Sequence, residues 1–130
     1  MYKEMFNKYL IQMHRFKELD VWINSIKLVE DVYKATSGFP GSEQFGITNQ
    51  IRRSAVSIPS IIAEGAGKNT NVDFCRFISI ASGSCNELET QLLISYKLNY
   101  LSSPDYKKLE IKLLSIQNML FGLQRSLHST

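Results

Sequence analysis

Residues 65–70 read Gly-Ala-Gly-Lys-Asn-Thr, and glycine followed by lysine is the chemistry that phosphate-binding loops use. The full motif needs a further glycine where Ile62 stands, and Asn69 occupies the place of its magnesium-binding serine or threonine. A helix precedes this segment, and a helix C-terminus presents carbonyl oxygens to a ligand, which disfavours phosphate. We therefore interpret Gly65 and Gly67 as residues that end a helix.

Four charged residues could be imagined as a general acid/base set: Glu64, Arg76, Glu87 and Glu89. Their positions also suit solvated helix faces and ordinary ion pairs, which is how we interpret them. A nucleophile elbow of the Gly-x-Ser-x-Gly type is absent from the sequence. We expect no catalytic residue.

Metal chemistry has little support in the sequence. A di-iron bundle needs Glu-x-x-His pairs, but Ile11 and Arg125 stand three residues before the two histidines, His14 and His128. Cysteine and histidine never cluster at zinc spacing. We expect neither a metal nor a cofactor.

The two cysteines, Cys75 and Cys85, lie ten residues apart in one expected helix. That spacing separates them by about 15 Å along the axis, whereas a disulfide needs Cα atoms within about 7 Å. We expect two buried free thiols.

Composition predicts a single globular domain. The chain has 130 residues, of which 44% are hydrophobic and 21% charged, and its net charge is +3. This charge is well short of that of a basic nucleic-acid-binding arm. Its longest uncharged run, residues 113–124, is shorter than the roughly 18 residues that span a membrane. Because the first residues also lack a secretory pattern, we expect a cytoplasmic protein without a membrane segment.

Four segments have apolar residues at the three- and four-residue spacing of one helical face. The first expected helix ends before residues 36–41, and its stripe is Leu19, Trp22, Ile26, Val29 and Tyr33. The second runs to Gly65 with Thr48 as N-cap, and its stripe is Ile47, Ile51, Ala55, Ile58 and Ile62.

The third expected helix has Thr70 or Asn71 as its N-cap and runs to about Tyr100, with the stripe Phe74, Ile78, Ala81, Cys85, Leu88 and Leu92. The fourth has Ser103 as N-cap and Pro104 as first helical residue, with the stripe Tyr106, Leu109, Leu113, Ile116, Leu120, Leu123 and Leu127. Short connections and the lack of strand-like alternation predict an all-α fold, an antiparallel up-down four-helix bundle. We place this bundle at residues 13–130 and an N-terminal extension at residues 1–12.

The second expected helix carries apolar residues beyond its core stripe. Val56, Pro59 and Ala63 lie on a flank between that stripe and a polar face, so a monomer would have to expose them. Pro59 also removes a backbone hydrogen bond and should bend the helix. The segment is either a kinked core helix with a solvated face or a contact surface between subunits, and we favour the contact surface.

Basic residues offer a second kind of surface. Arg52, Arg53, Lys68 and Arg76 surround the connection between the second and third expected helices, where they could contact phosphates. Charges of this kind are usually only solvated, so the pattern is unspecific.

Three stretches together resemble a known family. They are "FKELDVW" at residues 16–22, "FPGSEQFGITNQIRRSAVSIPSIIAEG" at residues 39–65 and "FCRFISIASGSCNELETQL" at residues 74–92. In this order they resemble the four-helix-bundle family named after 23S rRNA intervening-sequence proteins. Ile61 stands where that family usually has asparagine, which makes packing a better role for this position than a polar contact.

The resemblance implies an up-down bundle, often assembled into a homopentameric ring, without known catalytic residues. Similar bundles act as accessory proteins of diversity-generating retroelements, where a basic barrel is thought to engage nucleic acid and reverse transcriptase. Our leading hypothesis is a non-enzymatic homo-oligomer that contacts structured RNA or a ribonucleoprotein partner through Arg52, Arg53, Lys68 and Arg76. A purely protein-binding oligomeric scaffold is the alternative, and an enzyme would need a concave pocket with convergent charges.

Overall fold

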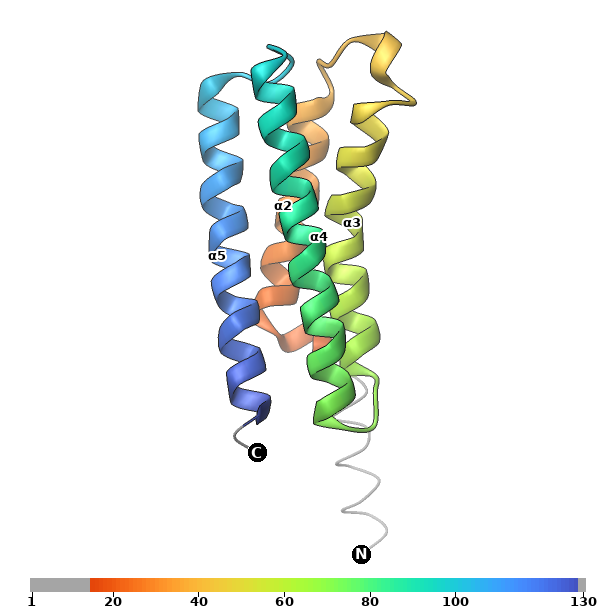
Figure 1. Ribbon diagram of the computed structural model, residues 1–130, viewed down its shortest axis with the longest axis vertical. Helices are drawn as coiled ribbons and strands as arrows, with labels where there is room; N and C mark the ends of the chain where they lie inside the picture. The colour runs from red at the N-terminus through yellow and green to blue at the C-terminus, as the bar shows by residue number, and fades with distance from the viewer. Residues whose placement is uncertain (1–14, 129–130) are drawn as a thin grey trace, which may run out of the picture.

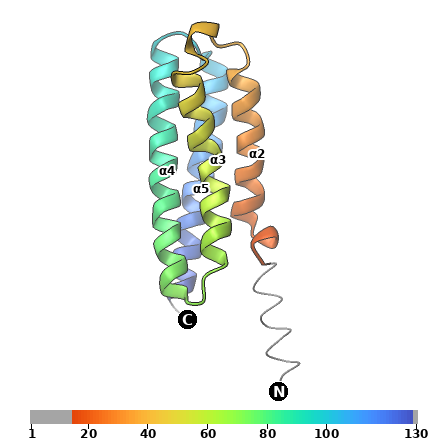
Figure 2. The ribbon, with the colours of Figure 1, turned by 90° about the vertical axis from the view of Figure 1, so that its right-hand side faces the viewer.

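Four α-helices form an antiparallel bundle in the computed structural model, which describes residues 15–128 (Figures 1 and 2). The predicted extension at residues 1–12 lies outside this range. The helices are α2 (Asp20–Thr36), α3 (Ile47–Ala66), α4 (Asn71–Lys97) and α5 (Ser103–His128), with short 3-10 turns at η1 (Arg15–Glu18) and η2 (Gly41–Glu43). The all-α fold class is confirmed.

Each helix packs against its neighbours in the chain, and α2 also packs against α5, which closes the bundle. One end of the bundle holds η2 and the α4–α5 connection, and we call it the η2 end (Figure 1). The other end holds η1 and the α3–α4 connection, and we call it the η1 end. Charged groups near the start and the finish of α3 therefore lie at opposite ends of the molecule.

The predicted stripes of three helices form the core. Every predicted stripe residue of α3 except Ile47 is fully buried, and so are the central residues of the α4 and α5 stripes. Cys75 and Cys85 are buried free thiols, as expected. No described helix is long and apolar enough to cross a membrane.

The stripe predicted for α2 is wrong by about one position. The buried residues of this helix are Val21, Ser25, Leu28, Val32 and Thr36. Two of them are polar and can be buried because each hydroxyl donates to a carbonyl oxygen of the same helix: Ser25 to Trp22, and Thr36 to Val32, both at 2.8 Å. The predicted stripe lies on the neighbouring flank, where Trp22 is half-buried and Tyr33 is exposed.

The N-cap predicted for α3 is also wrong. The helix begins after Gly46, the Glu43 carboxylate accepts from the Ile47 amide at 3.4 Å, and Thr48 lies inside the first turn. Thr48 is buried, and its hydroxyl has no hydrogen-bond partner among the described residues. Pro59 lies inside α3, which continues through it to Ala66.

The other two caps are of the expected residue types. Thr70 accepts a hydrogen bond from the Asp73 amide at 3.1 Å, so it caps α4 as predicted. In α5 the cap is one residue earlier than predicted, because the Ser102 hydroxyl accepts from the Asp105 amide at 3.3 Å.

Helices α3 and α4 approach each other closely near the η1 end. Gly65 is buried there, and a Cβ atom added to it would lie 2.6 Å from the Cβ of Phe77 and 3.0 Å from Cδ1 of Phe74. Atoms that close must move apart, so the lack of a side chain at Gly65 allows this contact.

Candidate nucleic-acid interface

The four predicted phosphate contacts do not form one surface. Arg52 and Arg53 lie in the first turns of α3 near the η2 end, whereas Lys68 and Arg76 flank the α3–α4 connection at the η1 end. Helix α3 advances about 20 Å between Arg53 and its own last residue, Ala66. This distance is at least twice the Debye length of about 8–10 Å at physiological salt. The sequence proximity of Arg52 and Arg53 to the connection was therefore misleading, and the two pairs act separately.

Arg52 is held in place by α2. Its Nε donates to the Thr36 hydroxyl at 2.9 Å, and its guanidinium carbon lies 4.5 Å from the centroid of the Tyr33 ring. Arg52 also helps to line a groove at this end of the bundle. A guanidinium fixed in this way loses less conformational freedom when it binds an anion.

Arg53 is the exposed cation of this end. It makes no hydrogen bond, ion pair or ring contact with the residues that the structure describes. It lines the same groove, of about 620 Å³, together with Tyr33, Gln44, Phe45, Thr48, Asn49, Arg52, Val56 and Ser57. Two arginines and no carboxylate line this groove, so its local charge is positive.

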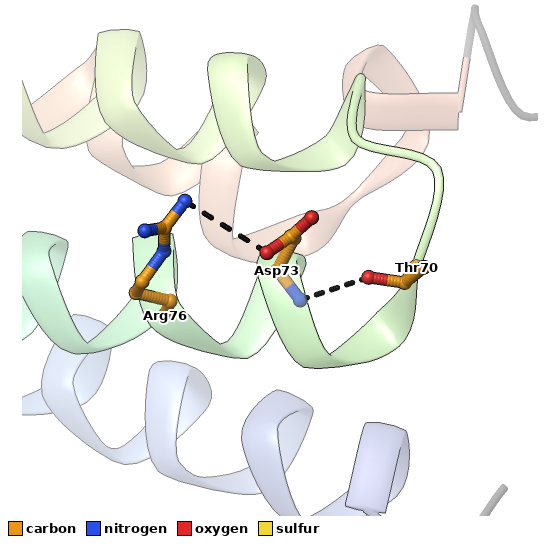
Figure 3. Close-up of polar contacts among 3 residues, drawn as sticks. All are labelled: Thr70, Asp73 and Arg76. Atoms are coloured by element: carbon orange, nitrogen blue, oxygen red, sulfur yellow. Dashed lines mark hydrogen bonds and ion pairs between the residues drawn. The ribbon is translucent and has the colours of Figure 1, made fainter.

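Lys68 and Arg76 are largely occupied by their own surroundings. The Lys68 amine lies 4.9 Å, and the Arg76 guanidinium 5.6 Å, from the ring centroid of Phe77. Arg76 also pairs with Asp73 at 3.8 Å, next to the Thr70 cap (Figure 3). Because Asp73 offsets one of the two positive charges, this pair attracts an anion less strongly than the pair at the η2 end.

The predicted subunit-contact flank is smaller than expected. Pro59, expected to be exposed, is buried, and Ala63 is half-buried, so Val56 at 40% is the most exposed of the three. The residue spacing of α3 placed Pro59 beside the core stripe, but it could not show how much of this helix the neighbouring elements cover. Both α2 and η1 pack against this helix.

The sequence reasoning missed several exposed apolar residues, including Phe45 and a group on α5. Phe45, between η2 and α3, is 89% exposed. On α5, exposed Ile111, Leu114 and Phe121 share a face opposite the core stripe, and we call this the α5 outer face. A wheel of α5 beyond its core stripe would have found the group on α5, whereas the exposure of one loop phenylalanine has no sequence signal.

The carboxylates considered for catalysis do not converge. Glu64, Glu87 and Glu89 are exposed, and Glu87 accepts a hydrogen bond from Gln91 at 3.3 Å.

Burial, together with the charge of Glu89, raises the pKa of Cys85 to about 12, so this thiol is protonated at neutral pH. Within residues 15–128, no three His, Cys, Asp or Glu side chains gather closely enough to hold a metal ion.

Comparison with known families identifies the chain's relatives. The profile of the family described as 23S rRNA-intervening sequence protein matches residues 17–122, which is most of the bundle. The chain belongs to this family. None of the curated proteins compared with the chain matches it.

A solved structure of the same architecture supports the fold of this 23S rRNA-intervening sequence family member. It is a protein with unknown function from the S23 ribosomal protein family of Bacteroides thetaiotaomicron, with a TM-score of 0.62 and 20% sequence identity. The match covers 87% of this chain and 97% of that one. At this identity the likeness supports the bundle and says nothing of a ligand.

Proposed function

We propose that the protein is a non-enzymatic, cytoplasmic helical bundle that self-associates and contacts RNA or a ribonucleoprotein partner. The observation that carries this proposal is the groove at the η2 end, where Arg52 is preorganised and where, within residues 15–128, Arg53 is unpaired and no carboxylate is part of the lining. Membership of a family named for sequences within 23S rRNA favours RNA over other polyanions. The resemblance of this chain to the family, and to the accessory proteins of diversity-generating retroelements, also favours a pentameric ring and a reverse transcriptase as a further partner.

A protein-binding scaffold is the second candidate. The α5 outer face favours it, since Ile111, Leu114 and Phe121 are 70%, 56% and 63% exposed on one side of the helix. Together with Val56 and Ala63 on α3, it offers two separate apolar faces for contact between copies. Self-association and RNA contact are compatible, because a ring would repeat each weak RNA contact and raise the overall affinity.

RNA binding is tested by filter retention of labelled total RNA across a salt series. Each lysine or arginine that neutralises a phosphate releases condensed counterion, so the logarithm of affinity falls with the logarithm of salt, by about 0.7–0.9 per contact. We expect the quadruple change of Arg52, Arg53, Lys68 and Arg76 to alanine to abolish most retention. The Arg52/Arg53 double variant accounts for most of that loss.

The control matched to the Arg52/Arg53 double variant replaces Lys107 and Lys108 with alanine, which also removes two charges, from the first turns of α5. Both lysines are exposed, and α5 packs against α2 and α4. This control should keep its RNA retention. The RNA proposal fails if the wild type retains no RNA at low salt, or if the folded quadruple variant retains as much as the wild type.

A further inference from the structure

Phe45 lies in an unusual position for a large apolar side chain. It is 89% exposed at the η2 end, directly before the Gly46 that precedes α3. Phe39, in the same connection, is instead buried, with its ring centroid 5.8 Å from that of Tyr100. The connection thus anchors one phenylalanine in the core and leaves the other in water.

The groove beside Phe45 combines two kinds of group. Phe45 and Tyr33 supply aromatic surface, and Arg52 and Arg53 supply positive charge. Aromatic rings beside cations are the combination by which proteins hold single-stranded nucleic acid, with bases stacked on the rings and phosphates at the cations. An apolar peptide would leave both arginines unpaired, so charge complementarity favours a polyanion.

We propose that this groove binds an unpaired segment of RNA, with one base stacked on Phe45 and the adjacent phosphates held by Arg53 and Arg52. This inference rests on the proposed RNA contact and specifies its form. The neighbouring groove, of about 370 Å³, shares Arg53 but includes Glu87, so the strand runs on the Phe45 side. Gln44 and Asn49 also line the groove and offer amide groups to the edge of the base.

A duplex fits this surface less well. Paired bases are stacked inside the helix, and a side chain reaches them only where the strand is open. Two arginines alone provide few phosphate contacts, and the other pair of cations lies about 20 Å or more away along α3. Stacking must therefore supply part of the affinity, which only an unpaired base allows.

The test measures binding of fluorescently labelled single-stranded 12-mer RNA and of a 12-base-pair RNA duplex at low salt. The proteins are the wild type, Phe45→Ala, Phe45→Trp and Arg53→Ala. Stacking on one aromatic residue is worth about fivefold or more in affinity, so we expect Phe45→Ala to weaken single-strand binding at least about fivefold. Its salt dependence should stay that of the wild type because no charge is removed, whereas Arg53→Ala should flatten the slope by about 0.7.

Phe45→Trp keeps a stacking surface and adds a spectroscopic signal. We expect it to bind the single strand as the wild type does and to show quenched tryptophan fluorescence, measured as the difference from the wild type with its single Trp22. Quenching that follows the binding curve supports a base on the ring.

The failures can be told apart. If the wild type binds neither RNA, the proposed function itself fails. If it binds RNA but prefers the duplex, or if Phe45→Ala binds as tightly as the wild type, the stacking inference fails and the RNA contact stands. If Phe45→Ala changes the mass measured by light scattering, Phe45 belongs to a contact between copies of the protein and the inference is overturned.

Discussion

Replacing Gly65 with alanine tests the close packing of α3 against α4. In an exposed helix interior, glycine to alanine adds about 0.5–1 kcal/mol to the free energy of unfolding. At Gly65 the new Cβ would lie 2.6 Å from the Cβ of Phe77, where carbon atoms normally stay about 3.5 Å apart or more. The Phe77 Cβ is fixed to the backbone, so α4 itself has to move. Overpacking of this kind costs about 1–3 kcal/mol, and we expect a net loss of about 1–2 kcal/mol.

The matched control is Gly83→Ala on α4, because nothing lies within 4 Å of a Cβ added to Gly83. We expect this variant to gain about 0.5–1 kcal/mol. Urea unfolding followed by circular dichroism measures both, at one protein concentration because the stability of an oligomer depends on concentration. A Gly65→Ala midpoint equal to or above that of the wild type, with an unchanged slope, would refute the close contact.

Three further predictions concern a cap, a thiol and the assembly. Thr70→Ala should lower the free energy of unfolding by about 1 kcal/mol, measured by urea unfolding, because the Asp73 amide loses its acceptor. Burial raises the pKa of Cys85 from 9.0 to about 12, so above pH 9 the thiol ionises in the unfolded chain but stays protonated in the folded one. The free energy of unfolding should therefore fall as the pH rises from 9 toward 12, and it should fall less in Cys85→Ala. The protein should be an oligomer by light scattering at micromolar concentration, and Ala63→Glu should dissociate it by burying a charge; a monomeric wild type would contradict self-association. Leu114→Glu makes the same test on the α5 outer face.

The sequence predicted those elements whose apolar spacing is regular and long. On α5, the central leucines and isoleucine recur without a break, so both the helix and its buried face were clear. On α2, two faces are partly apolar, and the structure buries the one with Ser25 and Thr36. Their hydroxyls are satisfied by carbonyl oxygens within the helix, so a buried polar residue was possible where a hydropathy pattern favours Trp22 and Tyr33. Which face of α2 is buried depends on how the neighbouring helices pack against it, and the sequence of α2 alone does not determine this.

The candidate site was predicted in its residue types but not in its arrangement. Arg53 was predicted as a phosphate contact and is exposed, but residue spacing could not show that Phe45 and Arg53 line the same groove. Residue spacing also placed Pro59 in solvent, because the coverage of a helix flank depends on how its neighbours are oriented. Thr36 is a comparable case. It fixes Arg52 through a hydrogen bond between two helices, and residue spacing within one helix cannot predict such a contact.

The two ends of the bundle differ in how their positive charges are used. At the η1 end, Lys68 and Arg76 both lie against the Phe77 ring, and Asp73 offsets part of their positive charge. At the η2 end, the contacts of Arg52 with Thr36 and Tyr33 orient it without neutralising its charge. Arg53 makes no contact with the described residues that a ligand would have to replace. The two cation pairs therefore attract a phosphate unequally, because only the pair at the η1 end has a carboxylate, that of Asp73, paired with it. Any RNA bound by one copy of this protein should begin at the η2 end, and a ring of copies would extend its path from one such groove to the next.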